Sequence, residues 1–137
     1  MKHIVFPRMR ELGKHHLSWD FHIHANFVDG KNSVEEMVGS AISMGLTKLA
    51  FTEHARSSFK IWWPEYVKAV RDIRVSVAKE LEVILGLEAN AIGVPGNVDL
   101  TNEMVDSAQL ILGSIHGYYH ADTWEKISVS QLSADDA

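Results

Sequence analysis

Residues 19–25 read WDFHIHA, a short run in which apolar and polar side chains alternate. Alternation with a period of two is typical of a β-strand, because successive side chains point to opposite faces of the sheet. The pattern predicts a strand with Phe21 and Ile23 on one face and His22 and His24 on the other. Because residues two apart on a strand point the same way, both imidazoles are expected to reach one metal ion.

The segments after this strand alternate between predicted helices and predicted strands. Ser33, with Glu36 three residues later, predicts the capped start of a helix that Gly45 ends, and Pro64 predicts the start of a longer helix. Further strands are predicted from apolar runs at residues 48–52, 82–88 and 109–116. Apolar strands that alternate with helices indicate an α/β domain with a parallel sheet, either open or part of a β/α barrel.

The composition is that of a globular domain, with 46% hydrophobic and 23% charged residues over 137 positions and no linker or repeat. The net charge of -5 argues against a broad grip on nucleic acid, which needs clustered Lys and Arg. The chain has no cysteine, so a metal would be held by histidines and carboxylates. No stretch predicts a secretory signal or a membrane span, and we expect a cytoplasmic protein without a membrane partner.

Metal-capable side chains recur at the ends of the predicted strands. His22 and His24 lie near the end of the first strand, His54 follows the second, Glu88 ends the third and His116 ends the fourth. In a parallel β/α barrel these strand ends open onto one rim, where active sites are built. A single histidine is more often a core residue, but four consecutive strands with such ends predict a shared metal site.

The chain resembles the PHP (polymerase and histidinol phosphatase) family in five ordered motifs, which are Asp20-Phe-His22-Ile-His24, Asp29-Gly30, Thr52-Glu53-His54, Gly86-Leu-Glu88 and Ser114-Ile-His116. The resemblance runs from about Asp20 to His116. It implies a distorted parallel β/α barrel of seven strands that holds two or three divalent metal ions, often zinc, manganese or iron. It also implies a hydrolase of phosphate esters, in which a metal-activated water attacks phosphorus.

The resemblance implies six metal ligands, which are His22, His24, Asp29, His54, Glu88 and His116. The two histidines of the first strand would bind one ion, and Glu88 would bridge that ion to a neighbour, which makes it a catalytic residue too. Asp29 and His54 would bind a second ion, and His116 a third. Asp29 also fits a simpler interpretation as the first residue of an Asp-Gly turn.

Other catalytic roles are more open. Arg56, two residues past His54, is a candidate phosphate clamp, since a guanidinium can pair bidentately with phosphate, but it also fits a surface loop. His120 is a candidate proton donor to the leaving group, and Lys60 a second clamp. Aromatic residues in the loops would either pack or shape a substrate pocket: Trp62, Trp63, Tyr118, Tyr119 and Trp124. Three histidines match no motif and are expected at the surface: His3, His15 and His16.

PHP proteins usually supply a further His and a final Asp-x-His from later strands, and here only His120-Ala-Asp122, in the reverse order, follows His116. We therefore expect residues 1–137 to be one PHP domain, the N-terminal part of a longer barrel, with residues 1–18 as an extension before the first motif. The fourth strand would lack the fifth strand that normally covers it, and its uncovered apolar residues would favour self-association. These residues are Ile111, Leu112 and Ile115.

Four functions stay open. A histidinol-phosphatase-like enzyme acting on a small phosphorylated substrate is favoured. A PHP nuclease or polymerase-associated domain acting on DNA is disfavoured by the acidic balance. An amidohydrolase barrel would want a lysine as a metal bridge on a middle strand, where this chain has Glu88. The fourth is a metal-binding module without activity because its last ligands are absent.

Overall fold

The computed structural model of the chain describes residues 7–58, 60–92, 97–120 and 123–126, and the side chains of residues 15, 117–120 and 123–126 lie outside that description. The elements follow in the order η1 (Met9–Glu11), η2 (Lys14–Ser18), β1 (Trp19–Ile23), α1 (Val34–Ser43), β2 (Lys48–Ala55), α2 (Trp63–Ser76), β3 (Glu82–Ile92), β4 (Asn97–Val98), α3 (Asn102–Ser107), β5 (Leu110–Ser114), β6 (Gly117–His120) and β7 (Thr123–Lys126).

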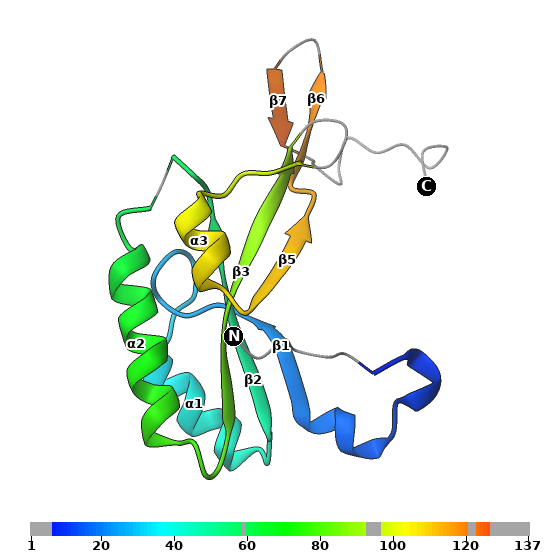
Figure 1. Ribbon diagram of the computed structural model, residues 1–137, viewed down its shortest axis with the longest axis vertical. Helices are drawn as coiled ribbons and strands as arrows, with labels where there is room; N and C mark the ends of the chain where they lie inside the picture. The colour runs from blue at the N-terminus through cyan, green and yellow to red at the C-terminus, as the bar shows by residue number, and fades with distance from the viewer. Residues whose placement is uncertain (1–6, 59, 93–96, 121–122, 127–137) are drawn as a thin grey trace.

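The main sheet places β1, β2, β3 and β5 side by side and parallel, while the short β4 runs antiparallel along the end of β3. Figure 1 shows α1 and α2 together on one face of this curled sheet, which leaves the other face for the inside of a half-barrel. The hairpin β6–β7 forms a separate two-stranded sheet. The expected α/β class and the partial parallel β/α barrel are confirmed.

Helix α1 begins and ends as its sequence predicts. The Glu36 amide donates to Ser33 Oγ at 3.2 Å, and the Ser33 amide donates to Glu36 Oε2 at 2.9 Å, which completes the capping box. Gly45 has φ of 77°, a left-handed conformation in which glycine carries no steric penalty. Pro64 was expected to begin the second helix, but α2 begins one residue earlier, at Trp63, and Pro64 lies in its first turn.

The core between the sheet and the helices is built around the aromatic residues of α2. Tyr66 is fully buried, and its hydroxyl lies 2.9 Å from the Phe51 carbonyl oxygen and 2.8 Å from that of Gly86, so it can donate its proton to either strand. Trp62 and Trp63 are also in this core, with 6% and 3% of their surfaces exposed. Of the two roles open to them, these tryptophans take the packing role.

Strand β1 differs from its predicted alternation. Asp20 pairs with Leu49 but Ile23 pairs with Phe51, so β1 has one residue more than β2 over this interval. Such a bulge turns the following side chains to new directions. As a result Phe21 packs on the inner face of the sheet while Ile23 packs toward the helices, and the prediction that they share a face is wrong.

The structure also differs from the sequence predictions at the end of β3 and at His16. Strand β3 continues four residues past Glu88, the end that was predicted for it, because β5 pairs with Ala89 and Asn90 and β4 pairs with Ala91 and Ile92. His16 was expected at the surface, but it is partly buried and its ring meets Trp19 edge-on, with centroids 4.3 Å apart. His3 lies outside the described residues. None of the described helices is long and apolar enough to cross a membrane.

Among the described strands, β5 forms strand hydrogen bonds with β3 only. Ile111 and Ile115 are exposed, the latter over 71% of its surface, whereas Leu112 packs against the inner cluster. Self-association through this edge stays a prediction.

Candidate metal centre

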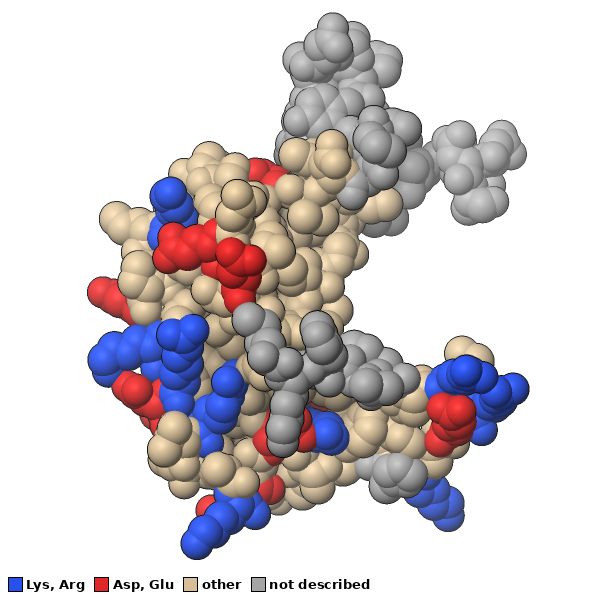
Figure 2. Space-filling view, in the orientation of Figure 1, with Lys and Arg blue, Asp and Glu red and all other residues tan. Residues whose placement is uncertain are grey.

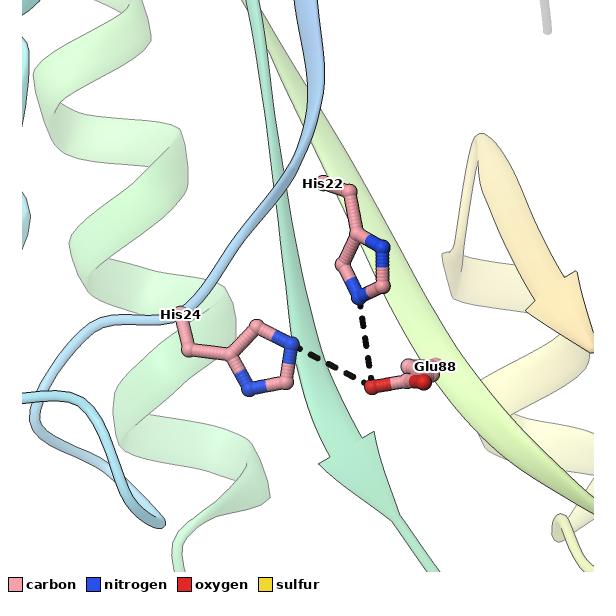
Figure 3. A group of neighbouring side chains, drawn as sticks. All are labelled: His22, His24 and Glu88. Carbon is pink, nitrogen blue, oxygen red and sulfur yellow. Dashed lines mark ion pairs between the residues drawn. The ribbon is translucent and has the colours of Figure 1, made fainter. Parts of the chain in front are cut away.

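Four histidines surround the carboxylate of Glu88, which is 5% exposed. Glu88 Oε2 lies 3.3 Å from His22 Nε2 and 3.2 Å from His24 Nε2, as Figure 3 shows. The same oxygen lies 2.9 Å from His54 Nδ1, and Oε1 lies 3.4 Å from His116 Nε2. The strand-end residues singled out in the sequence therefore meet at one point.

The register of the sheet brings these side chains together. His54 on β2 is the direct pairing partner of Glu88 on β3, so the two side chains project from neighbouring strands on the same face. His22 and His24 come from the end of β1 on the other side of β2, and His116 follows the end of β5 on the other side of β3. All these positions are at the carboxyl end of the sheet, the rim on which β/α barrels carry active sites.

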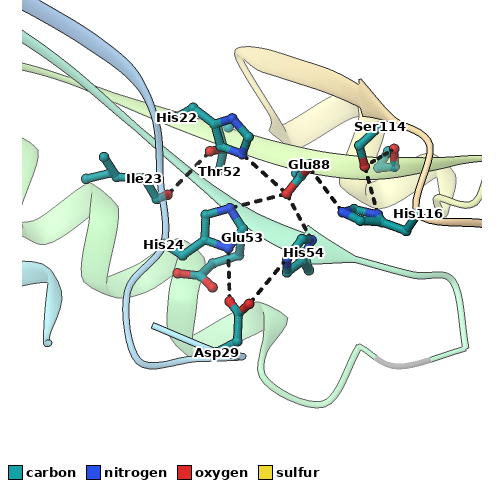
Figure 4. A network of polar contacts seen from close by, with 12 residues as sticks. His22, Ile23, His24, Asp29, Thr52, Glu53, His54, Glu88, Ser114 and His116 are labelled. Atoms are coloured by element: carbon teal, nitrogen blue, oxygen red, sulfur yellow. Dashed lines mark hydrogen bonds and ion pairs between the residues drawn. The ribbon is translucent and has the colours of Figure 1, made fainter. Parts of the chain in front are cut away.

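Asp29 reaches the cluster from the loop after β1. Its Oδ1 lies 3.0 Å from His24 Nδ1 and its Oδ2 lies 3.3 Å from His54 Nε2 (Figure 4). Gly30 allows this approach, because a Cβ at that position would overlap the carbonyl oxygens of His24 and Ala25. Asp29 thus precedes a turn glycine and also faces the proposed ligands, and the two interpretations of this residue are compatible.

The cluster contains three overlapping groups with metal-ligand spacing. They are His22, His24 and Glu88; His24, Asp29 and His54; and His54, Glu88 and His116, and within each group the ligand atoms lie within 4.8 Å of one another. Imidazole and carboxylate together suit zinc, manganese and iron. Glu88 Oε2 is buried without a hydrogen bond from any described group although three ring nitrogens lie near it. A buried oxygen in that state is suited to bind a divalent cation.

The local electrostatics favour the forms of these groups that bind metal. Burial alone would raise the pKa of Glu88, but the nearby imidazoles and the Ser114 hydroxyl outweigh it and lower that pKa. The hydrogen bond from His24 lowers the pKa of Asp29, and burial lowers the pKa of His54. Carboxylates that are ionised and an imidazole that is neutral are the states a divalent ion requires.

The remaining sequence candidates lie near this rim or outside the description. Arg56 directly follows β2 and is exposed, and Lys60 is exposed in the same connection. The Ser57 amide donates to Asp99 Oδ1 at 3.2 Å, which ties this connection to the segment after β4. His120 lies in β6, and its side chain is outside the described part of the chain.

Glu53 is a buried acid at the centre, and its role could not be predicted from the motif that contains it. Its side chain is fully buried on the helix-facing side of β2, where Oε1 accepts a hydrogen bond from the Ala25 amide, next to His24. Its Oε2 has no hydrogen bond from the described residues. Burial raises the pKa of Glu53 to about 7.

Replacing Glu53 by Gln should change how stability depends on pH. The pKa of Glu53 is 4.5 in the unfolded chain and about 7 in the folded protein. The stability that protonated Glu53 contributes is therefore fully present below pH 4.5 and is lost as the pH rises through about 7. In chelator, the wild type should lose on the order of 3 kcal/mol of unfolding free energy over this range relative to Glu53→Gln. Urea unfolding across the range measures this, and parallel curves would contradict it.

Comparison with known proteins agrees with the geometry. The family model of the PHP domain matches residues 20–134, and the chain therefore belongs to the PHP domain family. This is a family of metal-dependent hydrolases of the phosphoesterase type, whose domains bind divalent metals. No curated protein matches the chain.

Proposed function

We propose that this protein is a metal-dependent phosphoesterase of the histidinol-phosphatase type, acting on a small phosphorylated molecule. The observation that carries the proposal is the environment of Glu88, a buried carboxylate with an imidazole nitrogen from each of four histidines within 3.4 Å. The family membership supports it, because PHP domains bind divalent metals and hydrolyse phosphoesters.

The proposed ligands divide as the three groups of side chains suggest. His22 and His24 would hold one ion with Glu88, and Asp29 and His54 would hold a second. His116, whose Nε2 lies 3.4 Å from Glu88 Oε1, would hold a third. When bound, two or three zinc, manganese or iron ions would neutralise phosphate charge and activate the water that attacks phosphorus.

The chain's own residues then have to place the substrate. In this proposal Arg56, exposed at the end of β2, pairs with the phosphate oxygens, and a guanidinium does this best in bidentate geometry. His120 is proposed as the proton donor to the leaving oxygen. Figure 2 shows Lys and Arg side chains interspersed with Asp and Glu on the face seen there, and the net charge is -5. That distribution supports a small substrate more than a nucleic acid, which needs a basic surface.

The purified protein should hydrolyse an aryl phosphate when manganese or zinc is present. Activity should fall by at least about a thousandfold in chelator, because metal charge supplies several kcal/mol of transition-state stabilisation, and metal should restore it. Arg56→Ala should raise KM, with Arg71→Ala on α2 as the matched control. If single-stranded DNA is degraded and aryl phosphate is not, the nuclease interpretation replaces this one. Metal binding without any hydrolysis would leave a metal-binding module.

A further inference from the structure

We propose that Asn90 is a positioning residue that holds the ring of His116 with Nδ1 protonated and with the lone pair of Nε2 directed at the metal centre. The proposal deepens the proposed function and rests on it. It concerns a contact on the far side of His116 from Glu88, made by a residue outside the set of metal ligands.

The contact is short and sheltered. Asn90 Oδ1 lies 2.6 Å from His116 Nδ1, and Asn90 has only 9% of its surface exposed. Ser114 Oγ lies 2.9 Å from the same nitrogen, as Figure 4 shows. The other ring nitrogen, Nε2, lies 3.4 Å from Glu88 Oε1. One edge of the imidazole thus faces two oxygens while the other edge faces the carboxylate of the centre.

The chemistry of the two oxygens decides which ring nitrogen carries the proton. The amide oxygen of Asn90 can only accept a hydrogen bond. The hydroxyl of Ser114 has another acceptor for its single proton, since Ser114 Oγ lies 3.4 Å from the Ala89 carbonyl oxygen. Ser114 Oγ can then accept from Nδ1 as well. With two acceptors on one side, Nδ1 must donate, and a neutral imidazole that is protonated there has its lone pair on Nε2.

The fold makes His116 dependent on this contact. It follows the end of β5, between the exposed Ile115 and the start of β6, so no strand pairing fixes its side chain. Asn90, by contrast, is held within β3 and pairs directly with Ser114. It lies two residues past Glu88 and therefore on the same face of the strand. The rigid strand that supplies the central carboxylate thereby also orients the ligand that comes from the less constrained segment.

Two substitutions at Asn90 separate this role from a structural one. Asn90→Leu keeps the size but removes the acceptor, and Asn90→Asp restores an acceptor oxygen. Loss of such a hydrogen bond behind a ligating histidine typically costs about 10–100-fold in metal affinity. We expect Asn90→Leu to weaken zinc binding by about that factor at the site that includes His116. Asn90→Asp should bind zinc nearly as tightly as the wild type. Asn102→Leu, at an exposed position that begins α3, is the matched control and should bind as the wild type does.

The direct readout is the protonation site of His116 in the metal-free wild type, from long-range ¹H–¹⁵N NMR of the imidazole, which needs neither activity nor a folded variant. We expect the proton on Nδ1. A proton on Nε2 would overturn the proposal, since it would mean that the Asn90 amide donates to Nδ1. So would zinc affinity in Asn90→Leu equal to that of the wild type, or an equal loss in Asn90→Asp. Tight zinc binding and the expected NMR result without phosphatase activity would sink the proposed function and leave this inference standing.

Discussion

Glu88→Gln should abolish turnover and weaken metal binding. Replacing a residue that only hydrogen-bonds to a metal ligand costs roughly 10–100-fold in metal affinity. The loss should be larger here, because Glu88 is itself a proposed ligand. It belongs to two of the three metal-capable groups. Glutamine keeps the shape of the side chain but removes the negative charge that the two cations would share. The loss of several kcal/mol of electrostatic stabilisation corresponds to a fall in kcat/KM of about a thousandfold or more.

Glu82→Gln is the matched control, because Glu82 lies at the other end of the same strand. Its carboxylate is exposed and pairs with Lys48 at 2.5 Å, an ion pair of the kind that contributes little to stability. Titration of both variants with manganese and zinc, together with an aryl phosphate assay, measures the effect. A Glu88→Gln protein that kept wild-type metal affinity would contradict the bridging role.

Replacing His22 and His24 together by Ala should remove most of the bound metal. These two residues take part in two of the three groups, and the group that survives is His54 with Glu88 and His116. The double variant should therefore retain at most the ion held by that group, while His116→Ala alone should spare the ions on the β1 side. Elemental analysis after dialysis gives the stoichiometries.

His16→Ala is the control for that double variant, since His16 packs against Trp19 in the segment before β1 and belongs to none of the metal-capable groups found among the described residues. It should leave the metal content unchanged. Full metal content in the double variant, or an equal loss in His16→Ala, would show that the ions are held elsewhere.

The clustering of His and acidic side chains at one rim could be predicted from the sequence because its signal is local. A metal-capable side chain at the end of each apolar strand marks a shared rim whatever the details of packing, and the structure brings His54 and Glu88 into direct register there. The direction of Phe21 could not be predicted, because it depends on a bulge whose presence is set by the pairing of β1 with β2.

Asn90 and Glu53 were missed for reasons that can be named. Ending the third strand at Glu88 removed Asn90 from consideration, although the alternation continues through it and places it on the face of Glu88. For Glu53, counting back along β2 to Phe51 puts it on the face that packs against the helices. The alternation of side chains along β2 is therefore enough to predict a buried carboxylate at this position. It was overlooked because the neighbouring His54 accounts for the motif.

The assignment of Glu88 as the centre of a metal site is tested most directly by anomalous X-ray diffraction from crystals loaded with zinc or manganese, recorded at the absorption edge of the metal. The account predicts anomalous density beside the Glu88 carboxylate, with His22 and His24 on one side of it. Density elsewhere on the protein, or none beside Glu88 in crystals shown by fluorescence to contain the metal, would contradict it.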